Sequence, residues 1–214
     1  KDNKKDVYKN LALVSEKMKI RQKSLMLMNQ THSNKVIIIN KKNKNSKNFN
    51  ADALITKMTG IALGVVTADC VPIILYDIKN QIIGCIHAGW KGSFSGIIEN
   101  TIKKFKKLNT KNNIFASVGP CIGKKSYEVD IDFYKRFVSK SKKNSIYFYK
   151  KNVNKKLFNL RKYVSDELER LNVKVDHVNH DTFAKKKNFF SFRRSQKLQE
   201  KDYGRGISVI SLTF

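Results

Sequence analysis

The order of apolar and polar residues along the chain predicts alternating helices and strands. Val7, Leu11, Val14 and Met18 recur every three or four residues, which predicts a helix over residues 4–20. Short runs rich in β-branched residues predict strands instead. These runs cover residues 25–28, 36–40, 61–67, 71–76, 82–86 and 114–118. Several runs are apolar throughout, which is typical of strands covered on both faces of a sheet.

The second half of the chain continues this alternation. Helices are predicted over residues 95–108, 132–140 and 157–171, and strands over 173–178, 189–192 and 206–212. A polar Lys/Asn-rich stretch at 41–50 is predicted to be a mobile loop. No repeat or linker interrupts residues 1–214, so we expect one domain with a mixed, layered α and β fold.

Composition narrows the range of partners. The chain carries 44 Lys and Arg against 17 Asp and Glu, which gives a net charge of +27. Most of this excess is Lys interspersed with Asn, whereas base readout and bidentate phosphate contacts usually use Arg. No nucleic-acid-binding motif is recognisable. We therefore expect no specific nucleic-acid partner, and interpret the charge as a general attraction for anionic substrates.

The same composition predicts where the protein resides. The apolar runs are far too short to cross a bilayer, and no secretion signal is visible. Three cysteines without a repeating spacing do not suggest a disulfide framework. We expect a cytoplasmic protein with no membrane partner. Its oligomeric state, monomer or homodimer, stays open.

Three residues near predicted strand ends are the main chemical candidates. His32 lies in a polar turn, Cys70 follows Asp69 between two apolar runs, and His87 ends an apolar run. Two histidines and one thiolate suit a catalytic zinc with a fourth position open for water, whose pKa zinc lowers to about 7. Their spacing is not a compact metal motif. The residues alone therefore favour a simpler interpretation over the metal site, with a hydrogen-bonded His32, a core Cys70 and a His87 at a strand end.

Arg193 and Arg194 are a second candidate feature. Adjacent arginines in a chain dominated by lysine indicate bidentate recognition of phosphate or carboxylate, although a surface ion pair explains them equally well. If residues 189–192 form a strand, only one of the two arginines can enter a given pocket.

Ordered motifs along the whole chain resemble a known family. They are NQTHSNKV (29–36), ADALIT (51–56), TADCVPIIL (67–75), IHAGWKGSFSGI (86–97), VGPCIGKKSYEV (118–129) and NFFSFRR (188–194). Together they resemble the YfiH family, also called the laccase-domain or polyphenol-oxidase-like family. The resemblance implies an α+β fold, a four-layer α/β/β/α sandwich similar to the cytotoxic necrotizing factor catalytic domain. It also implies that His32, Cys70 and His87 form the metal site.

The resemblance further implies several activities. Family members are described as purine nucleoside phosphorylases acting on adenosine, inosine and methylthioadenosine, with adenosine deaminase activity. Copper-dependent oxidation of polyphenols and hydrolytic editing of peptidoglycan precursors are the alternatives. Four histidines in total are too few for a multicopper oxidase, although a His₂Cys set also suits a single copper. A metal-free hydrolase would use Cys70 as nucleophile and His87 as base.

We prefer nucleoside chemistry at zinc, with inorganic phosphate as co-substrate. Asp69 is then expected to be catalytic and to shuttle a proton. The residues expected to bind substrate are Gln30, Lys91, Arg193 and Arg194, helped by the helix N-terminus after Gly92.

The chain departs from the family pattern in three places. The usual N-terminal segment with an Arg and a Gly-Gly pair is not recognisable, so part of the substrate pocket is expected to be missing. Asp181-Thr182 stands where the family has Cys-Thr, so that Cys is not essential here. Lys91 replaces the Arg that usually follows His-Ala-Gly-Trp, which keeps the charge but loses the bidentate fork.

Overall fold

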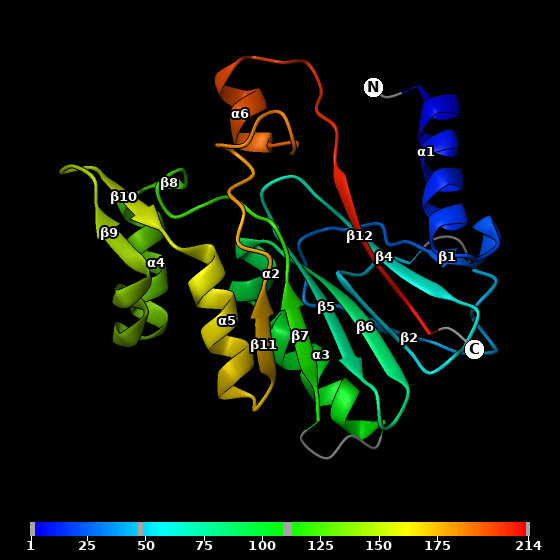
Figure 1. The fold of residues 1–214 in the computed structure, drawn as a ribbon. Coiled ribbons are helices and arrows are strands. Elements are labelled where there is room, and N and C mark those ends of the chain that lie inside the picture. Colours follow the sequence, from blue (N-terminus) through cyan, green and yellow to red (C-terminus); the bar gives the residue numbers. More distant parts are fainter. Residues whose placement is uncertain (1–2, 47–48, 109–112, 213–214) are drawn as a thin grey trace.

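A six-stranded mixed sheet forms the centre of the protein (Figure 1). The computed structural model describes residues 3–46, 49–108 and 113–212. The strand order in the sheet is β11-β7-β5-β6-β3-β2. These strands are β2 (Val36–Ile39), β3 (Ala53–Thr56), β5 (Val71–Asp77), β6 (Ile82–Ala88), β7 (Phe115–Val118) and β11 (Lys174–His177). The β2–β3 and β7–β11 pairs are parallel, and the other pairs are antiparallel.

Helices cover one face of this sheet and a second sheet covers the other. The helices α3 (Ile97–Lys107) and α5 (Leu160–Arg170) place Ile98, Phe105 and Leu168 in the core of the first face. The second sheet has the order β1-β4-β12, built from β1 (Leu25–Met26), β4 (Ala62–Thr67) and β12 (Gly206–Ser211). Leu63 and Val65 of β4 pack against Leu54 and Cys85 between the two sheets.

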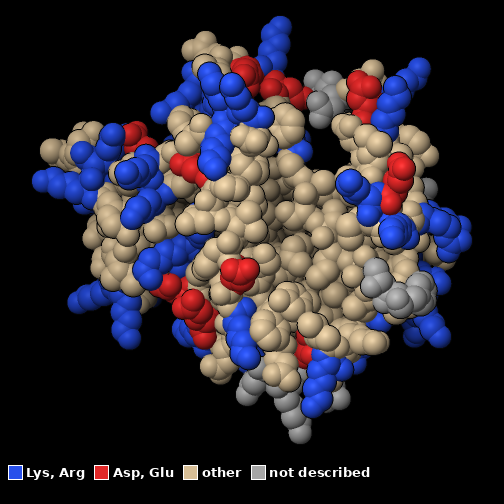
Figure 2. All heavy atoms as spheres, in the orientation of Figure 1, with Lys and Arg blue, Asp and Glu red and all other residues tan. Residues whose placement is uncertain are grey.

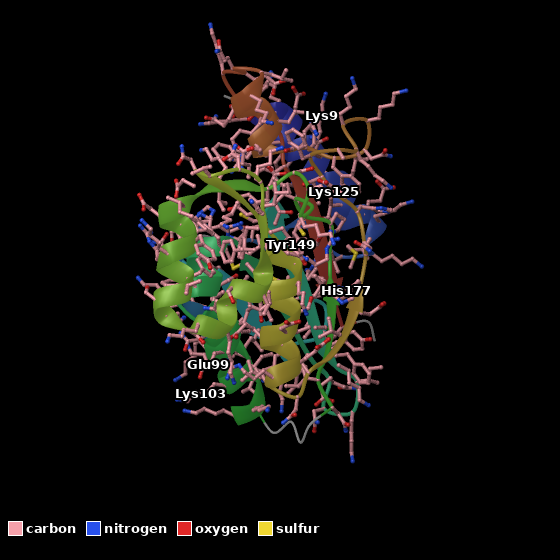
Figure 3. All side chains as sticks on the ribbon, turned by 90° about the vertical axis from the view of Figure 1, so that its left-hand side faces the viewer. Lys9, Glu99, Lys103, Lys125, Tyr149 and His177 are labelled. Carbon is pink, nitrogen blue, oxygen red and sulfur yellow. The ribbon has the colours of Figure 1, made fainter. Side chains whose placement is uncertain are left out.

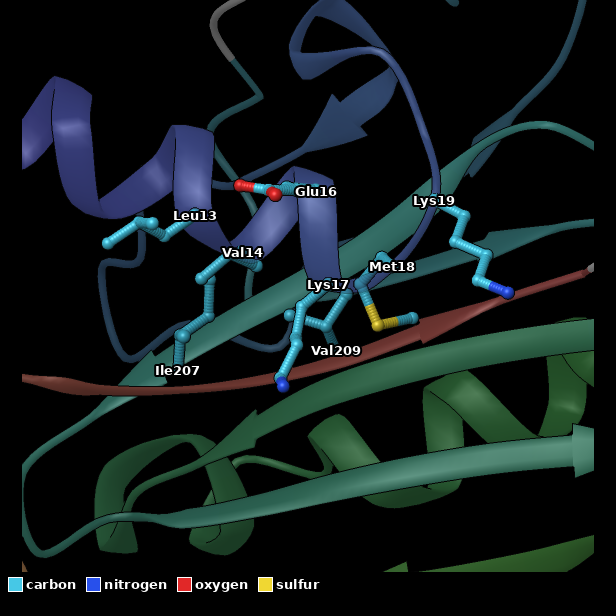
Figure 4. Close-up of a pocket in the computed structure, with 8 residues that line it drawn as sticks. All are labelled: Leu13, Val14, Glu16, Lys17, Met18, Lys19, Ile207 and Val209. Carbon is cyan, nitrogen blue, oxygen red and sulfur yellow. The ribbon is translucent and has the colours of Figure 1, made fainter.

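The helix α1 (Lys4–Lys17) adds the fourth layer, on the outer side of the second sheet (Figure 1). Val14 and Met18 line an open groove of about 790 Å³ together with Ile207 and Val209 of β12 (Figure 4). The α/β/β/α sandwich predicted from the family resemblance is therefore confirmed.

A small third sheet stands beside this sandwich. It has the order β8-β10-β9. Its elements are β8 (Glu128–Asp130), α4 (Ile131–Lys140), the 3-10 helix η2 (Lys142–Tyr147), β9 (Phe148–Lys150) and β10 (Lys155–Phe158). The remaining short helices are η1 (Gln22–Ser24), α2 (Trp90–Phe94) and α6 (Phe192–Lys197).

Three predicted elements differ from the structure for local reasons. The helix predicted over 157–171 begins only at Leu160, because Leu157 belongs to β10 and Asn159 caps the helix through Lys162 N. The helix predicted over 95–108 is preceded by the separate helix α2, and Gly96 with φ +90° divides the two. The strand predicted over 189–192 is wrong. Ser191 instead caps α6 by accepting from Arg194 N.

Two further predictions concern the surface. Residues 47 and 48 of the predicted mobile loop at 41–50 lie outside the described residues. The turn before them is held by Asn43, whose side chain accepts from Asn40 N and donates to Ile38 O. Across the described parts of the chain, no helix has the length and apolar character needed to span a membrane.

Candidate metal centre

Three residues that are distant in sequence meet where the central strands of the six-stranded sheet end. His32 comes from the loop between β1 and β2, Cys70 from the β4–β5 connection, and His87 from β6. Their ligand atoms all lie within 4.8 Å of one another. Cys70 Sγ is 3.6 Å from His32 Nε2, and the two imidazole centroids are 4.6 Å apart. His87 is buried and His32 is exposed, so the cluster opens to solvent on the His32 side.

A buried carboxylate that the sequence reasoning missed fixes both histidines. Asp52 is fully buried, and its Oδ1 lies 2.8 Å from His87 Nδ1. The same carboxylate accepts hydrogen bonds from the backbone N–H groups of Thr31, His32 and Ser33 and from the Ser33 hydroxyl. Because His87 Nδ1 points to Asp52, His87 Nε2 is the nitrogen left for a ligand. Metal-binding histidines are commonly oriented in this way.

Backbone conformation sets the space between the ligands. His32 has φ 57° and Asp69 has φ 84°, a region in which most residues with a side chain are rare. A Cβ atom added to Gly89 would lie 2.7 Å from His32 Cδ2 and 2.9 Å from Cys70 Sγ. Gly89 therefore keeps open the space between two of the three ligand side chains.

Burial and neighbouring charges shape the protonation of the ligands. Partial desolvation of the otherwise accessible His32 imidazole lowers its pKa below the usual 6.5. The charges of His87 and Lys91 lower this pKa further, and Asp52 opposes the shift. Burial raises the pKa of the Cys70 thiol to about 12, and the negative charge of Asp69 adds to this shift. A cation at this position would offset that shift, since metal coordination deprotonates a thiol.

Asp69 connects the Cys70 side of the cluster to the C-terminal part of the chain. The side chain is buried, and its carboxylate accepts from Thr182 Oγ1 at 2.7 Å, Ser191 Oγ at 2.9 Å and Arg193 N at 2.7 Å. These donors hold both carboxylate oxygens. The contacts indicate that Asp69 positions the backbone at Arg193, while its expected role as proton shuttle stays a prediction.

Arg193 and Tyr127 place a cationic and an aromatic side chain near Cys70. The Arg193 guanidinium lies 5.2 Å from the Tyr127 ring centroid and donates to Glu128 O. Burial raises the pKa of Tyr127, and the nearby Cys70 adds to this shift, which agrees with a tyrosine close to the cluster. Sequence reasoning missed Tyr127, although it lies within the motif VGPCIGKKSYEV.

The other predicted substrate-binding residues have different surroundings. Lys91 is exposed near His32, with its Nζ 5.7 Å from the Trp90 ring centroid. The Gln30 side-chain amide instead pairs with the backbone of Val66 on β4. The Arg194 guanidinium donates to the carbonyl oxygens of Thr182, Phe183 and Phe189. Of these three side chains, only Lys91 is without a hydrogen-bond partner in the described part of the chain.

The departure at Asp181-Thr182 is accommodated by hydrogen bonds. Asp181 Oδ2 accepts from Ser126 Oγ at 2.7 Å, and Asp181 Oδ1 accepts from Phe183 N. Thr182 is the residue that donates to Asp69. Asp181, which replaces the usual family cysteine, therefore stabilises the surrounding loops through these hydrogen bonds.

The donor set fits one metal ion. The two imidazole nitrogens and the thiolate sulfur lie close enough together to bind the same ion. Zinc prefers such a ligand set, which also suits copper. Asp52 behind His87 supplies the outer hydrogen bond that such sites use. The space between His32 and Cys70, kept free by Gly89, completes the fit.

The fold and this site define a class of protein: an α+β sandwich that gathers two histidines and a cysteine into a candidate metal centre. Residues 1–213 match the family described as multi-copper polyphenol oxidoreductase laccase, and the chain belongs to this family, the YfiH family of the sequence motifs. The family membership expected from the motifs is therefore confirmed.

Known relatives and solved structures agree with this placement. A purine nucleoside phosphorylase of Rickettsia conorii is 36% identical over 182 residues, 84% of this chain and 75% of that protein. A purine nucleoside phosphorylase of Haemophilus influenzae is 34% identical over 212 residues, 98% of this chain and 82% of that protein.

Among solved structures, the Bacillus licheniformis hypothetical protein YfiH has a TM-score of 0.90 and 23% identity, and the match covers 100% of this chain and 83% of that chain. The Neisseria meningitidis protein NMB0706 has a TM-score of 0.86 and 26% identity, with 100% and 84% covered.

Proposed function

We propose that this protein is a metal-dependent purine nucleoside phosphorylase whose active site is the His32/Cys70/His87 cluster. The observation that carries the proposal is the convergence of these three side chains, with Asp52 orienting His87 and Gly89 leaving room between His32 and Cys70. The relatives named purine nucleoside phosphorylase support the choice of reaction, because they match most of the chain.

The proposed metal is zinc, held by His32, Cys70 and His87. When bound, zinc supplies Lewis acidity and lowers the pKa of a water molecule at its open position. The exposed side of the cluster, at His32, is where a substrate would enter. Asp52 keeps His87 Nδ1 engaged, so that Nε2 faces the ligand position throughout the reaction.

The cationic side chains near the cluster suit the second substrate, inorganic phosphate. In phosphorolysis a phosphate oxygen forms a bond to C1′ of the ribose, the bond from C1′ to the purine nitrogen breaks, and the purine leaves with a proton. Lys91 and Arg193 are the proposed phosphate ligands, because the Lys91 ammonium has no hydrogen-bond partner among the described residues and the Arg193 backbone is held by Asp69, next to Cys70 in the chain. Charge-assisted hydrogen bonds from such groups are the usual means of holding phosphate.

Three of the residues expected from the sequence have a supporting role in this proposal. Gln30 holds the His32 loop to β4, and Arg194 closes the loop before α6 through three backbone carbonyls. Asp69 holds the backbone N–H of Arg193. We propose that Tyr127 adds an aromatic surface for the nucleoside, since its ring already stacks under Arg193.

We further propose that adenosine, inosine and methylthioadenosine are substrates and that adenosine is also deaminated at this site. Deamination replaces the amino group at C6 with oxygen from water and releases ammonia. It needs an activated water at the same open position, so it competes with phosphorolysis. Inosine lacks this amino group and reports phosphorolysis alone.

Two alternatives give different results in the same assay. A single copper in the His₂Cys set would oxidise polyphenols and would leave inosine unchanged. A metal-free hydrolase would need the Cys70 thiolate, and the burial that raises the pKa of this thiol to about 12 disfavours that form. Peptidoglycan precursors are the substrate class to include for the second alternative.

The test is phosphorolysis of inosine by the purified, zinc-loaded chain. We expect hypoxanthine and ribose 1-phosphate to form in equal amounts, and only when phosphate is present. His87→Ala should abolish this activity, whereas His177→Ala serves as the matched control because His177 is exposed at the end of β11. Full activity in His87→Ala, or after complete removal of the metal, would contradict the proposal.

A further inference from the structure

A basic groove lies outside the metal centre, between the edge strand β2 and the helix α3. It has a volume of about 490 Å³. Lys35 and Val36 line it from the β2 side, and Asn100, Lys103 and Lys107 line it from α3. Since β2 is the last strand of the central sheet, no further strand covers this side of the groove in the described part of the chain.

Hydrogen bonds fix the floor of the groove. Lys104 Nζ donates to Val36 O at 2.6 Å, which occupies an outward-facing carbonyl of the edge strand. Asn100 Nδ2 donates to Asn34 O, and Asn34 Nδ2 donates to Ser95 O. These contacts join the segment before β2 to the region of α3 at several points. A ligand would therefore meet a surface that is already ordered, which reduces the entropic cost of binding.

The rim of the groove carries lysines without partners. Lys35, Lys103 and Lys107 are exposed, and within the described residues no hydrogen bond or ion pair engages their ammonium groups. Glu99 lies one turn before Lys103 on α3 (Figure 3) but does not line the groove. None of the described lining residues is acidic. The positive charge at the rim is therefore not neutralised within the groove.

The spacing of these charges indicates an extended anion. Lys103 and Lys107 are neighbours at i and i+4 on one face of α3, with Cβ atoms about 5–6 Å apart. Lys35 approaches from the β2 side of the groove. A chain of linked phosphates presents several anionic oxygens along its length, so it can engage ammonium groups on both sides of the groove at once, whereas a single phosphate offers fewer oxygens at one point. Lysine ammonium groups bind such oxygens as point charges.

The lining residues also argue against recognition of a nucleobase. No aromatic side chain lines the groove in the described part of the chain, and proteins that bind single-stranded nucleic acid usually stack bases on aromatic rings. We propose that this groove binds linked phosphates, either the triphosphate of a nucleotide or free inorganic polyphosphate. This site is separate from the proposed phosphate ligands Lys91 and Arg193, and the inference does not depend on the proposed function.

The test must separate the groove from the overall charge of the protein. Lys and Arg are spread around much of the visible surface, so any polyanion will show some attraction (Figure 2). The groove variant is Lys103→Ala with Lys107→Ala. The matched control is Lys142→Ala with Lys143→Ala, because both lysines are exposed in η2 and the loss of charge is the same.

Binding should be measured by calorimetry on the full chain with sodium tripolyphosphate, ATP and orthophosphate, with the metal content checked before and after. We expect the groove variant to bind tripolyphosphate about tenfold more weakly, or worse, because two charge-assisted contacts are lost. The control variant should change by less than about twofold. ATP should follow tripolyphosphate, and orthophosphate should bind far more weakly than either.

Three results would overturn the proposal. Equal losses in the two double variants would assign the binding to net charge alone. Binding of ATP without binding of tripolyphosphate would assign recognition to the nucleoside. Tighter binding of a short single-stranded oligonucleotide than of tripolyphosphate would identify a nucleic-acid surface instead. Comparing ATP with tripolyphosphate in the wild-type chain distinguishes a nucleotide from inorganic polyphosphate as the preferred source.

Discussion

Two buried aspartates organise the two sides of the metal centre in different ways. Asp52 is paired with an ionisable side chain, His87, and also collects backbone N–H groups from the His32 loop. Among the described residues, the Asp69 carboxylate accepts only from neutral donors, two hydroxyls and one backbone N–H group. Asp52 therefore controls the geometry of two candidate metal ligands, whereas Asp69 controls how the C-terminal segment with Arg193 is attached beside Cys70.

We expect this difference to separate metal binding from substrate binding. If Asp52 governs the ligands, its loss should remove the metal together with the activity. If Asp69 governs Arg193, its loss should weaken phosphate binding and leave the metal in place. The two aspartates thus allow each function to be disturbed without the other, and the following changes test that separation.

Asp52→Asn should have the largest effect. The new amide NH₂ group would face N–H and O–H donors in a fully buried position, and the one remaining oxygen would be a neutral, weaker acceptor for His87. We expect metal affinity to fall about 10–100-fold, as for other outer-sphere partners of ligating histidines. The free energy of unfolding should fall by about 3–5 kcal/mol, since breaking a buried pair strands its partner.

Competition with a chelator and denaturant unfolding measure these two quantities. Asp132→Asn is the matched control, because this side chain is 82% exposed and only pairs with Lys135. The control should change stability by no more than about 0.5 kcal/mol. Unchanged metal affinity in Asp52→Asn would show that Asp52 does not control the geometry of the metal ligands.

Lowering the pH should test the contribution of Asp52 to stability. Burial alone would raise the pKa of this carboxyl, but hydrogen bonds from His87 and Ser33 outweigh it and hold the pKa well below the usual 3.8. Because the folded-state pKa is depressed, the stability from Asp52 is fully present above the unfolded-state value near 3.8. It is lost as the pH falls below that value towards the folded-state pKa. The wild-type chain should lose more stability than Asp52→Asn between pH 5 and pH 2, as followed by urea unfolding.

Gly89→Ala should disturb the metal site with a smaller effect on the fold. The added Cβ would press on His32 Cδ2 and Cys70 Sγ, so the ligands must move apart or rotate. We expect loss of metal binding together with about 1–3 kcal/mol of stability, as for overpacked cores. Gly206→Ala is the matched control, because its added Cβ would meet only Thr67 O at 3.9 Å. Normal metal binding by Gly89→Ala would show that this space is not part of the site.

Asp69→Asn should have the smallest effect on the metal and a specific effect on phosphate. One carboxylate oxygen becomes an NH₂ group that cannot accept from Thr182, Ser191 or Arg193 N. We expect about 1–3 kcal/mol of lost stability and an increased KM for phosphate, with metal content retained. Steady-state kinetics at varied phosphate concentration and metal analysis measure both effects. Loss of the metal would mean that the two aspartates do not divide the site as described.

The sequence predicted much of the fold because its elements have clear local patterns. The period of Val7, Leu11 and Val14 predicted α1, and apolar runs predicted β5 and β6. Two of the differences occurred where side-chain capping overrides an apolar pattern. Asn159 starts α5 after Leu157 and Phe158 have joined a sheet, and Ser191 starts α6 within a phenylalanine-rich segment. The spacing of apolar residues alone cannot locate the residue at which such a helix begins.

The candidate site also contains residues that the sequence could predict and residues that it could not. His32, Cys70 and His87 could be proposed because their residue types carry the chemistry and their positions at strand ends allow them to converge. Asp52 was missed because an acid between apolar residues gives no local signal of its partner, and its contacts reach residues about 20 and 35 positions away. The substrate contacts expected of Gln30 and Arg194 stay predictions, and in the folded chain these side chains bond to backbone groups of Val66 and Phe183. Only the folded chain brings those groups together.

The most direct test of the central claim is the metal content of purified protein after loading with zinc and removal of excess metal. The His32/Cys70/His87 site predicts about one zinc ion per chain, as expected for a three-ligand site with an open position. His87→Ala and Cys70→Ala should lose this ion, and His177→Ala should retain it. A stoichiometry unaffected by His87→Ala and Cys70→Ala would contradict the account, because the metal would then be bound by other residues.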